Sequence, residues 1–333
     1  MPDTNAEWFR CKIDKQRLKQ LSQRNDRTPL LWFGSYILLV IASGSAVALS
    51  WNTPWVWAWL ALYGALWGLA PSAVHETCHH TPFRTRWLNR AALWLFGWMV
   101  QMEPHSVRWG HTGHHSHTHF DEGDTELSEP NPVSWANFCN VGLGLWGALF
   151  YWKSLIWQGF GSITPEMRAV IPDGAIPRAI RNARYMLAVY LAVIVGGLLL
   201  QSWIPIVLAF APRLIGGPVT GFLHLTQHTG LQMNIRDHRY STRSFSAGPL
   251  TRYCYFNMNY HIEHHMFPLV PFYNLPQLAA ELSSQMPEPC KGLVGVYREI
   301  LTTVARQQRE PGYYHRKQVP ETTGEAIASA QAA

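Results

Sequence analysis

The sequence predicts an all-α integral membrane protein with four transmembrane helices in two hairpins and a helical cytoplasmic cap. A stretch without a single Asp, Glu, Lys or Arg runs from Thr28 through Val74, and a second apolar stretch covers residues 185–225. Charged residues make up only 14% of the 333-residue chain, whereas Trp occurs 16 times. This balance favours a membrane protein over a soluble one.

The first predicted hairpin lies within residues 28–74. That stretch is long enough for two spans of about 20 residues each. The segment Trp51–Pro54, which reads WNTP, is a turn signal between them. The many Trp side chains near this turn (Trp51, Trp55, Trp57 and Trp59) fit an interfacial aromatic belt, and a substrate channel is the alternative.

The second predicted hairpin begins with Tyr185–Trp203, which is a continuous apolar span. Its partner, Ile204–Leu225, is less regular because Pro, Gly and one Arg interrupt it. The interrupting residues are Pro205, Pro212, Arg213, Gly216, Gly217 and Pro218.

The orientation follows from the basic residues. Of the 27, seven lie in residues 1–30, nine between Arg84 and Arg184, and ten from Arg236 onward, whereas the two hairpin tips have none. The positive-inside rule therefore places both termini and the central segment in the cytoplasm of a multi-pass protein, and we expect the cell inner (plasma) membrane.

Three regions follow from this frame. Residues 1–30 are expected to be a cytoplasmic juxtamembrane segment that touches anionic lipid, and residues 31–280 a membrane and cap domain. A targeting peptide or a nucleic-acid arm is the alternative for the first region, but acidic residues are mixed in, no cleavable apolar core follows at once, and we expect no nucleic acid partner. Residues 281–333 form a C-terminal cytoplasmic extension, expected to be partly disordered after residue 320.

Histidines are concentrated in four short groups. They read HETCHH (75–80), HTGHH (111–115), HLTQH (224–228) and HIEHH (261–265). The topology, which uses only charge and hydrophobicity, places all four at one membrane face. On a helix, residues at i, i+3 and i+4 share a face, so each group aims its imidazoles at one point.

This number of histidines predicts two metal ions. A catalytic zinc takes three protein ligands and a structural zinc four, whereas about ten imidazoles are available. Burying so many rings without a metal would leave their nitrogens unsatisfied. Imidazole alone does not select among iron, zinc, copper and nickel. The predicted ligands are His75, His79, His111, His114, His115, His224, His228, His261, His264 and His265.

Further residues are expected to support these ligands. His80, Glu76, Asp121, Asp124 and Glu263 are candidates to orient the rings through hydrogen bonds, and solvated surface acids are the alternative for the carboxylates. His117 and His119 remain open between such support and a structural role. We expect His105, His238 and His315 to be packed or hydrogen-bonded residues. The five cysteines are scattered without a CxxC pair, which indicates neither a disulfide framework nor a cysteine metal site.

The histidine groups resemble those of the membrane fatty acid desaturase and hydroxylase superfamily. HETCHH is similar to its first histidine box and HTGHH, followed by Asp124 and Glu126, to its second. The segment Phe256–Leu278 is similar to the third-box region. The resemblance covers roughly residues 31–280. It implies a four-span fold whose cytoplasmic cap carries a histidine-rich di-metal site with two non-haem iron ions, and O2 as co-substrate. Where the acyl-coenzyme A branch of the family has an Asn, this chain has His224.

The implied reaction is O2-dependent removal of hydrogen from an unactivated C–H group of a lipid-like substrate from the bilayer. The third box with Phe-Pro downstream resembles desaturases more than alkane hydroxylases, so a fatty acyl desaturase is expected. The alternative is a hydroxylase of an alkyl, carotenoid or small amphiphilic substrate. Arg213 is costly inside a span; it either neutralises a substrate carboxylate, or it snorkels or marks a helix break.

An external electron donor is also expected, because the sequence contains no haem domain, no GxGxxG loop and no cysteine cluster. A ferredoxin, rubredoxin or cytochrome-type donor with its reductase would dock on the cap. The basic residues Arg236, Arg239, Arg243 and Arg252 could attract it, or could simply be positive-inside charge.

Two other classes of function compete. His75–His79 reads HETCH and matches the HExxH signature of zinc peptidases, and PDG at 172–174 faintly resembles a third-ligand motif of intramembrane proteases. A zinc membrane protease would leave the histidines of HTGHH (111–115) and HIEHH (261–265) without a role. A metal transporter without redox chemistry is the other alternative.

Overall fold

The computed structural model describes residues 7–320, and its chain is mostly helical with almost no strand. The predicted disorder after residue 320 lies outside the described residues. The chain divides into two compact units, each assembled from several segments. We call residues 25–112 and 139–224 the membrane unit, and the described residues of 1–24, 113–138 and 225–333 the polar unit.

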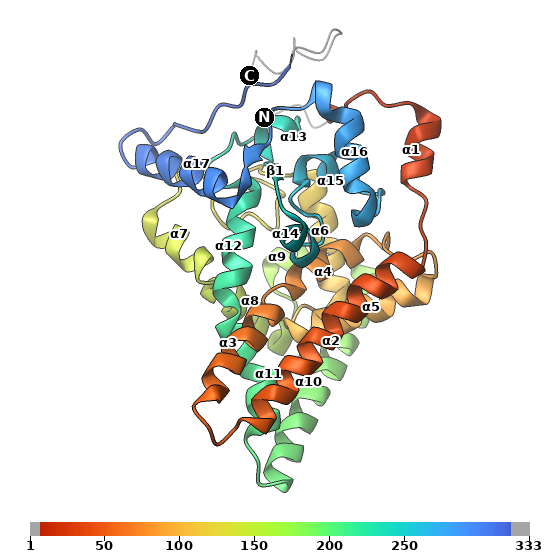
Figure 1. The fold of residues 1–333 in the computed structure, drawn as a ribbon, viewed down its shortest axis with the longest axis vertical. Coiled ribbons are helices and arrows are strands. Elements are labelled where there is room, and N and C mark those ends of the chain that lie inside the picture. Colours follow the sequence, from red (N-terminus) through yellow and green to blue (C-terminus); the bar gives the residue numbers. More distant parts are fainter. Residues whose placement is uncertain (1–6, 321–333) are drawn as a thin grey trace. The chain divides into compact units, whose positions relative to one another are not determined.

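The membrane unit is built from helices throughout (Figure 1). Three of its helices, α6, α7 and α12, continue into the polar unit. The elements are α2 (Arg27–Leu49), α3 (Trp55–Trp67), α4 (Ala70–Cys78), α5 (Arg86–Met99), α6 (Pro104–Ser116), α7 (Trp135–Gly142), α8 (Leu145–Gly159), α9 (Pro165–Arg168), η1 (Asp173–Ala175), α10 (Ile176–Leu199), α11 (Ile204–Ile215) and α12 (Gly217–His228).

Three stretches of the described chain are long and apolar enough to cross a membrane. They are Arg27–Leu49, Asp173–Leu199 and Ile204–His228. The predicted second span is instead split after Trp67, and its continuation α4 begins near Pro71. Proline lacks an amide hydrogen and suits the first turn of a new helix, so the chain restarts there. The third span begins and ends earlier than the predicted Tyr185–Trp203. A count of four spans therefore stays a prediction.

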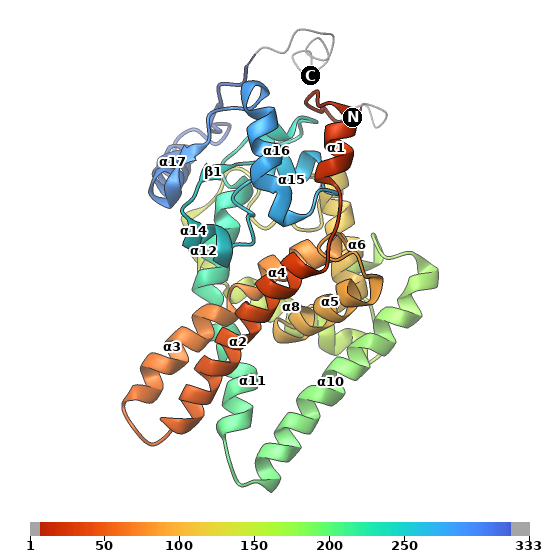
Figure 2. The same cartoon turned by 45° about the vertical axis from the view of Figure 1, so that its right-hand side comes forward.

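Small residues bring the apolar helices close together. Helices α2 and α3 form one antiparallel pair and α10 and α11 another, as Figure 2 shows. A Cβ atom on Gly216 would lie 2.1 Å from the carbonyl oxygen of Gly64, and one on Gly68 would lie 2.3 Å from that of Gly216. Only glycine permits this approach of α3 and α11, as is common in membrane helix packing.

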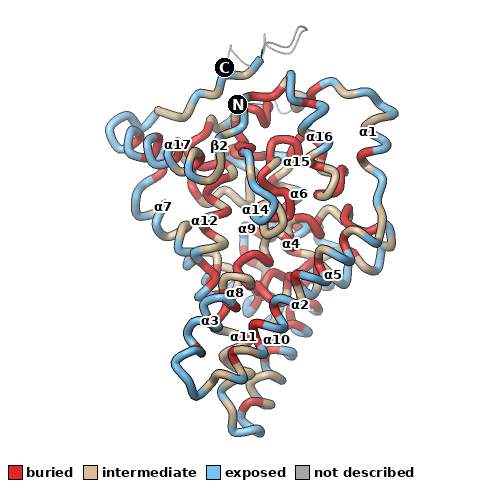
Figure 3. The backbone as a smooth tube through the Cα atoms, in the orientation of Figure 1, coloured by how far each residue is buried: buried red, intermediate tan, exposed pale blue. Residues whose placement is uncertain are grey.

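Many residues of these helices are exposed (Figure 3), and a large share of them are apolar. Leu38 on α2, Trp57 on α3 and Leu198 on α10 are 66%, 74% and 59% exposed. Soluble monomers rarely expose contiguous apolar surface on this scale. Together with the three candidate spans, this surface marks an integral membrane protein.

The polar unit combines short helices with one small parallel sheet. Its strands pair Phe245 with Cys290 and Ser246 with Lys291, and α17 packs against both strands. Every residue of α15 is buried. The elements are α1 (Lys15–Leu21), α13 (His238–Ser241), β1 (Phe245–Ser246), α14 (Pro249–Cys254), α15 (His261–Met266), η2 (Phe272–Asn274), α16 (Leu275–Leu282), η3 (Ser283–Gln285), β2 (Cys290–Lys291) and α17 (Gly292–Gln307).

Candidate metal centre

The membrane unit holds one group of three predicted ligands. His75 lies on α4, His79 is the C-cap residue directly after it, and His111 comes from α6. Their ligand nitrogens all lie within 4.8 Å of one another. The Nε2 atoms of His79 and His111 are 3.0 Å apart, and the ring centroids of His75 and His111 are 4.0 Å apart. These distances suit rings that share a cation.

A buried carboxylate fixes the start of α6, the helix that carries His111. Glu103 accepts hydrogen bonds from the backbone amides of His105 and Ser106, at 2.9 and 2.7 Å, and from the Asn182 side chain at 2.8 Å. A carboxylate at a helix N-terminus satisfies free amides and favours the helix dipole. Glu103 was not identified from the sequence; an acid directly before a Pro that opens a helix was the available signal.

The other predicted residues of this unit lie on α4, α6 and α12 or directly follow α4. Glu76 is fully buried on α4. His80 follows the end of α4 with φ of 56°, in the left-handed region. His224 is half-buried on α12, one turn before His228. His105 is hydrogen-bonded to Arg178 at 3.2 Å, in line with its expected structural role.

The polar unit holds a second group, formed by His114, His228 and His265. All three side chains are buried, and their ligand nitrogens lie within 4.8 Å of one another. They come from α6, α12 and α15, which are far apart in the sequence. One member of this group therefore comes from each of the second, third and fourth histidine motifs.

Hydrogen bonds orient each ring of this second group. His114 Nδ1 lies 2.8 Å from Asp124 Oδ1, and His228 Nδ1 lies 2.9 Å from the carbonyl oxygen of Ser241. His265 Nδ1 lies 3.1 Å from Thr118 Oγ1, whose own proton goes to the carbonyl oxygen of His114. With Nδ1 as the donor in each case, Nε2 carries the lone pair when the ring is neutral.

Three lone pairs that converge in a buried space need a cation between them. This donor set fits a transition metal such as iron, since each ring is held through its other nitrogen by a carbonyl, carboxylate or hydroxyl group. Thr118 was missed from the sequence; its position four residues after His114 is the signal that could have found it.

Three further predicted ligands surround this group. His261 Nε2 lies 3.2 Å from the Nε2 atoms of both His228 and His265. His115 and His264 have ligand nitrogens within 4.8 Å of each other. All of these histidines lie in the polar unit, so it alone gathers six of the ten predicted ligands: His114, His115, His228, His261, His264 and His265.

The acids predicted to orient the histidine rings differ in their hydrogen-bond partners. Asp124 contacts His114 directly, whereas the exposed Asp121 pairs with Asn234, its Oδ2 accepting a hydrogen bond at 2.7 Å. Glu263 is buried and accepts a hydrogen bond from Ser244 Oγ at 2.7 Å. Burial raises the pKa of Glu263, which favours its neutral form.

Electrostatics distinguishes two of the buried histidines. Burial opposes a charged ring at His114, but the Asp124 carboxylate outweighs it and raises the pKa of His114 to about 9. Burial and neighbouring histidines lower the pKa of His265 well below its ordinary value. His265 is therefore neutral at pH 7 and ready to coordinate, whereas a metal must displace a proton from His114.

The histidines outside the ten show three different environments. His119 is buried, and its Nδ1 lies 3.1 Å from the carbonyl oxygen of Gln232. His117 is exposed. As expected for structural residues, the buried His238 stacks on Trp8 at 4.1 Å, and His315 contacts Glu299 at 3.2 Å.

Two basic residues expected to attract an electron donor are buried instead. Arg239 is 3% exposed and pairs with Asp237 at 2.7 Å, and Arg243 is 1% exposed and pairs with Glu299 at 2.7 Å. Burying an arginine requires a partner charge, and both have one inside the polar unit. A docking role for these two residues is therefore wrong.

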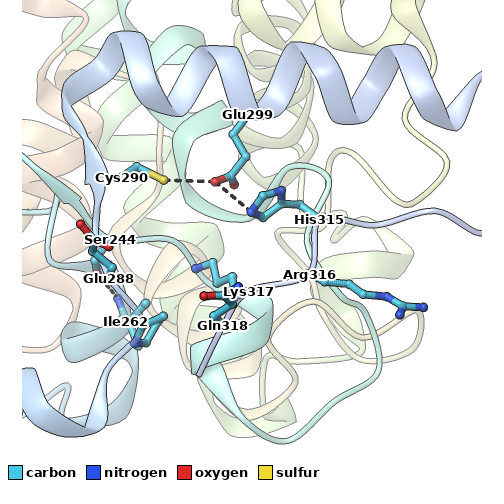
Figure 4. A pocket seen from close by; sticks show the side chains of 10 residues that line it. Ser244, Ile262, Glu288, Cys290, Glu299, His315, Arg316, Lys317 and Gln318 are labelled. Carbon is cyan, nitrogen blue, oxygen red and sulfur yellow. Dashed lines mark hydrogen bonds and ion pairs between the residues drawn. The ribbon is translucent and has the colours of Figure 1, made fainter. Parts of the chain in front are cut away.

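A separate cavity of about 300 Å³ lies in the polar unit beside β2 and α17. Figure 4 shows Glu299 between Cys290 and His315, with Lys317 close by. The Cys290 thiol donates to Glu299 at 3.2 Å. None of the ten predicted ligands lines this cavity.

Helices that expose apolar surface and histidines that gather in two groups are typical of a membrane protein with a metal site. Comparison with known proteins makes this specific. The fatty acid desaturase family model matches residues 49–294, and the chain belongs to that family. The family match confirms the resemblance of the histidine motifs. The chain is therefore an oxidoreductase of the lipid desaturase and hydroxylase type. This family uses iron and O2.

Individual relatives are distant. The chain is 26% identical to human sphingolipid delta(4)-desaturase/C4-monooxygenase DES2, over 70% of this chain and 69% of the relative. It is 25% identical to delta(5) fatty acid desaturase fat-4 of Caenorhabditis elegans, over 64% and 54%. It is 23% identical to acyl-lipid (9-3)-desaturase of Physcomitrium patens, over 62% of this chain but only 43% of the relative.

Proposed function

We propose that this chain is an O2-dependent di-iron oxidoreductase that removes hydrogen from an unactivated C–H group of a lipid, and that it acts as a fatty acyl desaturase. The convergence of three Nε2 lone pairs in the polar unit carries the proposal. The three-histidine group of the membrane unit supports it. The ten histidines predicted from the sequence are proposed to hold the two ions.

The protein contributes geometry and a dry environment. Bound iron with open coordination positions supplies the O2 chemistry that breaks an unactivated C–H bond. Asp124, Thr118 and the Ser241 carbonyl hold the rings of the second group in one tautomer. Their burial excludes water, which protects a reactive site from side reactions.

The proposed topology keeps four spans with both termini in the cytoplasm. The second span would be α3 followed by α4, bent at Gly68 and Leu69. The polar unit would then be the cytoplasmic cap, and the membrane would be the cell inner (plasma) membrane. The distribution of basic residues supports this orientation.

The substrate is proposed to be lipid-like and to enter from the bilayer. The relatives are named for sphingolipid, acyl-lipid and fatty acid desaturation. Hydroxylation is the second candidate, because the name of one relative also includes a C4-monooxygenase activity. Both reactions share removal of hydrogen and differ in the next step.

Electrons are proposed to come from a separate ferredoxin, rubredoxin or cytochrome-type donor and its reductase. Arg236 and Arg252 are partly exposed and remain candidates for attracting an acidic donor. Arg239 and Arg243 are already paired and are left out.

The zinc protease alternative explains less of the structure. One zinc at His75 and His79 leaves the buried group of His114, His228 and His265 without a role. Asp173, in the PDG segment, is exposed and pairs with Arg168 at 3.2 Å. Neither observation favours a peptidase.

Lipid mass spectrometry of cells that express the chain, compared with cells that express His228→Ala, tests the proposal. A lipid species lighter by two hydrogens, present only with the intact chain, supports desaturation. A species heavier by one oxygen supports hydroxylation instead. Identical lipid profiles in the two cultures, with a matching donor system supplied, would contradict an oxidase.

A further inference from the structure

Arg213 is a buried cation in the membrane unit. It lies in the last turn of α11, two residues before the helix ends at Ile215, and is 3% exposed. It does not reach the protein surface, so the snorkelling interpretation does not apply to it. Its position also coincides with the break between α11 and α12, as one interpretation of the sequence expected.

The guanidinium lacks a charge partner among residues 7–320. Its Nε is buried without a hydrogen bond, and the described structure gives it no salt bridge. The titratable groups that interact electrostatically with the Arg213 guanidinium are the phenols of Tyr151 and Tyr190. On the other side lies Gly147, where an added Cβ would be 3.6 Å from Nη2. An arginine buried among apolar helices without an acid is costly and is usually retained for function.

Two more unsatisfied polar atoms lie around the same tyrosine. The indole nitrogen of Trp98 is buried without a partner, and its ring stacks on Tyr190 with centroids 5.1 Å apart. Gln101 Nε2 donates to the Tyr190 hydroxyl at 2.6 Å, while its Oε1 is buried without a partner. The Tyr190 hydroxyl donates its proton to the carbonyl oxygen of Trp98, so it has no proton left for a ligand.

Orphaned buried groups of this kind call for an explanation by a bound molecule. Two of the three, Arg213 Nε and Trp98 Nε1, are donors. Aromatic rings pack on the tyrosine beside Trp98, since Trp152 and Phe210 both lie against Tyr190, at centroid distances of 4.8 and 5.2 Å. The surroundings therefore fit an apolar molecule with one acceptor-rich end.

We propose that Arg213, with Trp98, binds the anionic oxygen headgroup of the lipid substrate, which makes the enzyme selective for an acidic lipid such as a free fatty acid. The inference rests on the proposed function, since it concerns the same substrate. A guanidinium matches carboxylate and phosphate oxygens in geometry and charge. A neutral alcohol, ester or amide headgroup would leave the arginine charge uncompensated.

Binding of the headgroup at Arg213 would also determine where along the acyl chain the reaction occurs. Arg213 precedes His224 by eleven positions on the apolar stretch Ile204–His228, or roughly 16 Å at the rise of an α-helix. A headgroup fixed at Arg213 sets which carbon atoms can reach the metal. Selectivity for the headgroup and for the double-bond position should therefore change together.

Ligand binding to the purified, detergent-solubilised full chain tests this proposal. Titrations follow tryptophan fluorescence with three ligands of equal chain length: a fatty acid, the corresponding fatty alcohol and the alkyl phosphate. We expect the intact chain to bind the acid about tenfold or more tightly than the alcohol. The alkyl phosphate arm separates a carboxylate site from a phosphate site, and preference for either anion supports the inference.

Arg213→Gln should remove the preference while leaving alcohol binding unchanged, and Arg213→Lys should retain part of it. Trp98→Phe should weaken acid binding by a smaller factor. Arg184→Gln, at an exposed arginine that donates to the carbonyl oxygen of Gly159, is the matched control. Iron content and melting temperature of each variant show whether it is folded.

Equal affinity of the intact chain for acid and alcohol would overturn the inference, as would unchanged acid binding by a folded Arg213→Gln variant. These outcomes are distinct from a failure of the proposed function. If no lipid product forms but the anion preference depends on Arg213, the oxidase proposal fails and the binding site stands.

Discussion

The carboxylate of Asp124 joins two histidines of the polar unit. Its Oδ1 lies 2.8 Å from Nδ1 of His114, and its Oδ2 accepts a hydrogen bond from the backbone amide of His119 at 2.7 Å. It thus holds the second histidine motif and the loop that follows in one arrangement. Its neighbour Asp121 has no such contact and pairs with Asn234.

Asp124→Asn should therefore weaken iron binding by about 10–100-fold, the usual effect of losing a group that orients a metal ligand. Asp121→Asn is the matched control and should bind iron like the intact chain. Iron content after dialysis against graded chelator measures both. Equal iron retention by the two variants would show that Asp124 does not position a ligand.

A second prediction concerns the helix that carries His228. Arg243 donates to the carbonyl oxygens of Thr226 and Thr229, at 2.9 and 3.0 Å, and is held by Glu299. Glu299→Gln leaves this buried guanidinium without its carboxylate, and we expect a loss of about 3 kcal/mol in unfolding free energy. Glu310→Gln, which removes an exposed ion pair with Arg306, should have little effect. Similar unfolding midpoints in denaturant for both variants would contradict this role of Glu299.

A third prediction concerns helix packing in the membrane unit. Gly216→Ala places a Cβ about where the Gly64 carbonyl oxygen lies, so α3 and α11 must separate. We expect a clear drop in melting temperature in detergent, in line with the usual 1–3 kcal/mol cost of overpacking. Gly196→Ala on α10, where nothing lies within 4 Å of the new atom, should be neutral or slightly stabilising. The interpretation fails if both variants melt alike.

A fourth prediction is pH-dependent stability from Lys317, which is half-buried and donates to the carbonyl oxygen of Thr242. Burial, followed by the charge of Arg243, lowers the pKa of Lys317 to about 7 from an ordinary 10.5. Between these values the unfolded chain binds more protons, so unfolding free energy should rise with pH from about 7 to 10.5.

Lys317→Met removes this dependence. The melting temperature of the intact chain relative to Lys317→Met should be lowest at and below pH 7 and should increase toward pH 10.5, above which the amine is mostly neutral in both states. Parallel pH profiles for the two proteins would show that Lys317 does not titrate in the folded chain.

The sequence predicted much of this architecture because the bilayer and the metal both impose simple patterns. A charge-free stretch identifies apolar helices, and HxxxH or HxxHH identifies one helix face. The group of His75, His79 and His111 was predicted from such histidine spacings. The family assignment rests on the same motifs.

Other features depend on tertiary contacts and could not be predicted. The close approach of Gly68 to Gly216, next to the split after Trp67, is a contact of this kind. Arg239 and Arg243 look like surface charges until the fold supplies Asp237 and Glu299 as partners. The Ser241 carbonyl orients His228 through a contact that no local pattern marks.

Metal analysis of the purified full chain, by elemental quantification together with Mössbauer spectroscopy of iron-57-grown protein, tests the central claim most directly. The account predicts two iron ions per chain with the signature of a coupled pair, reduced in both His79→Ala and His228→Ala and retained in the exposed His117→Ala variant. A single zinc ion per chain, unaffected by His228→Ala, would contradict it.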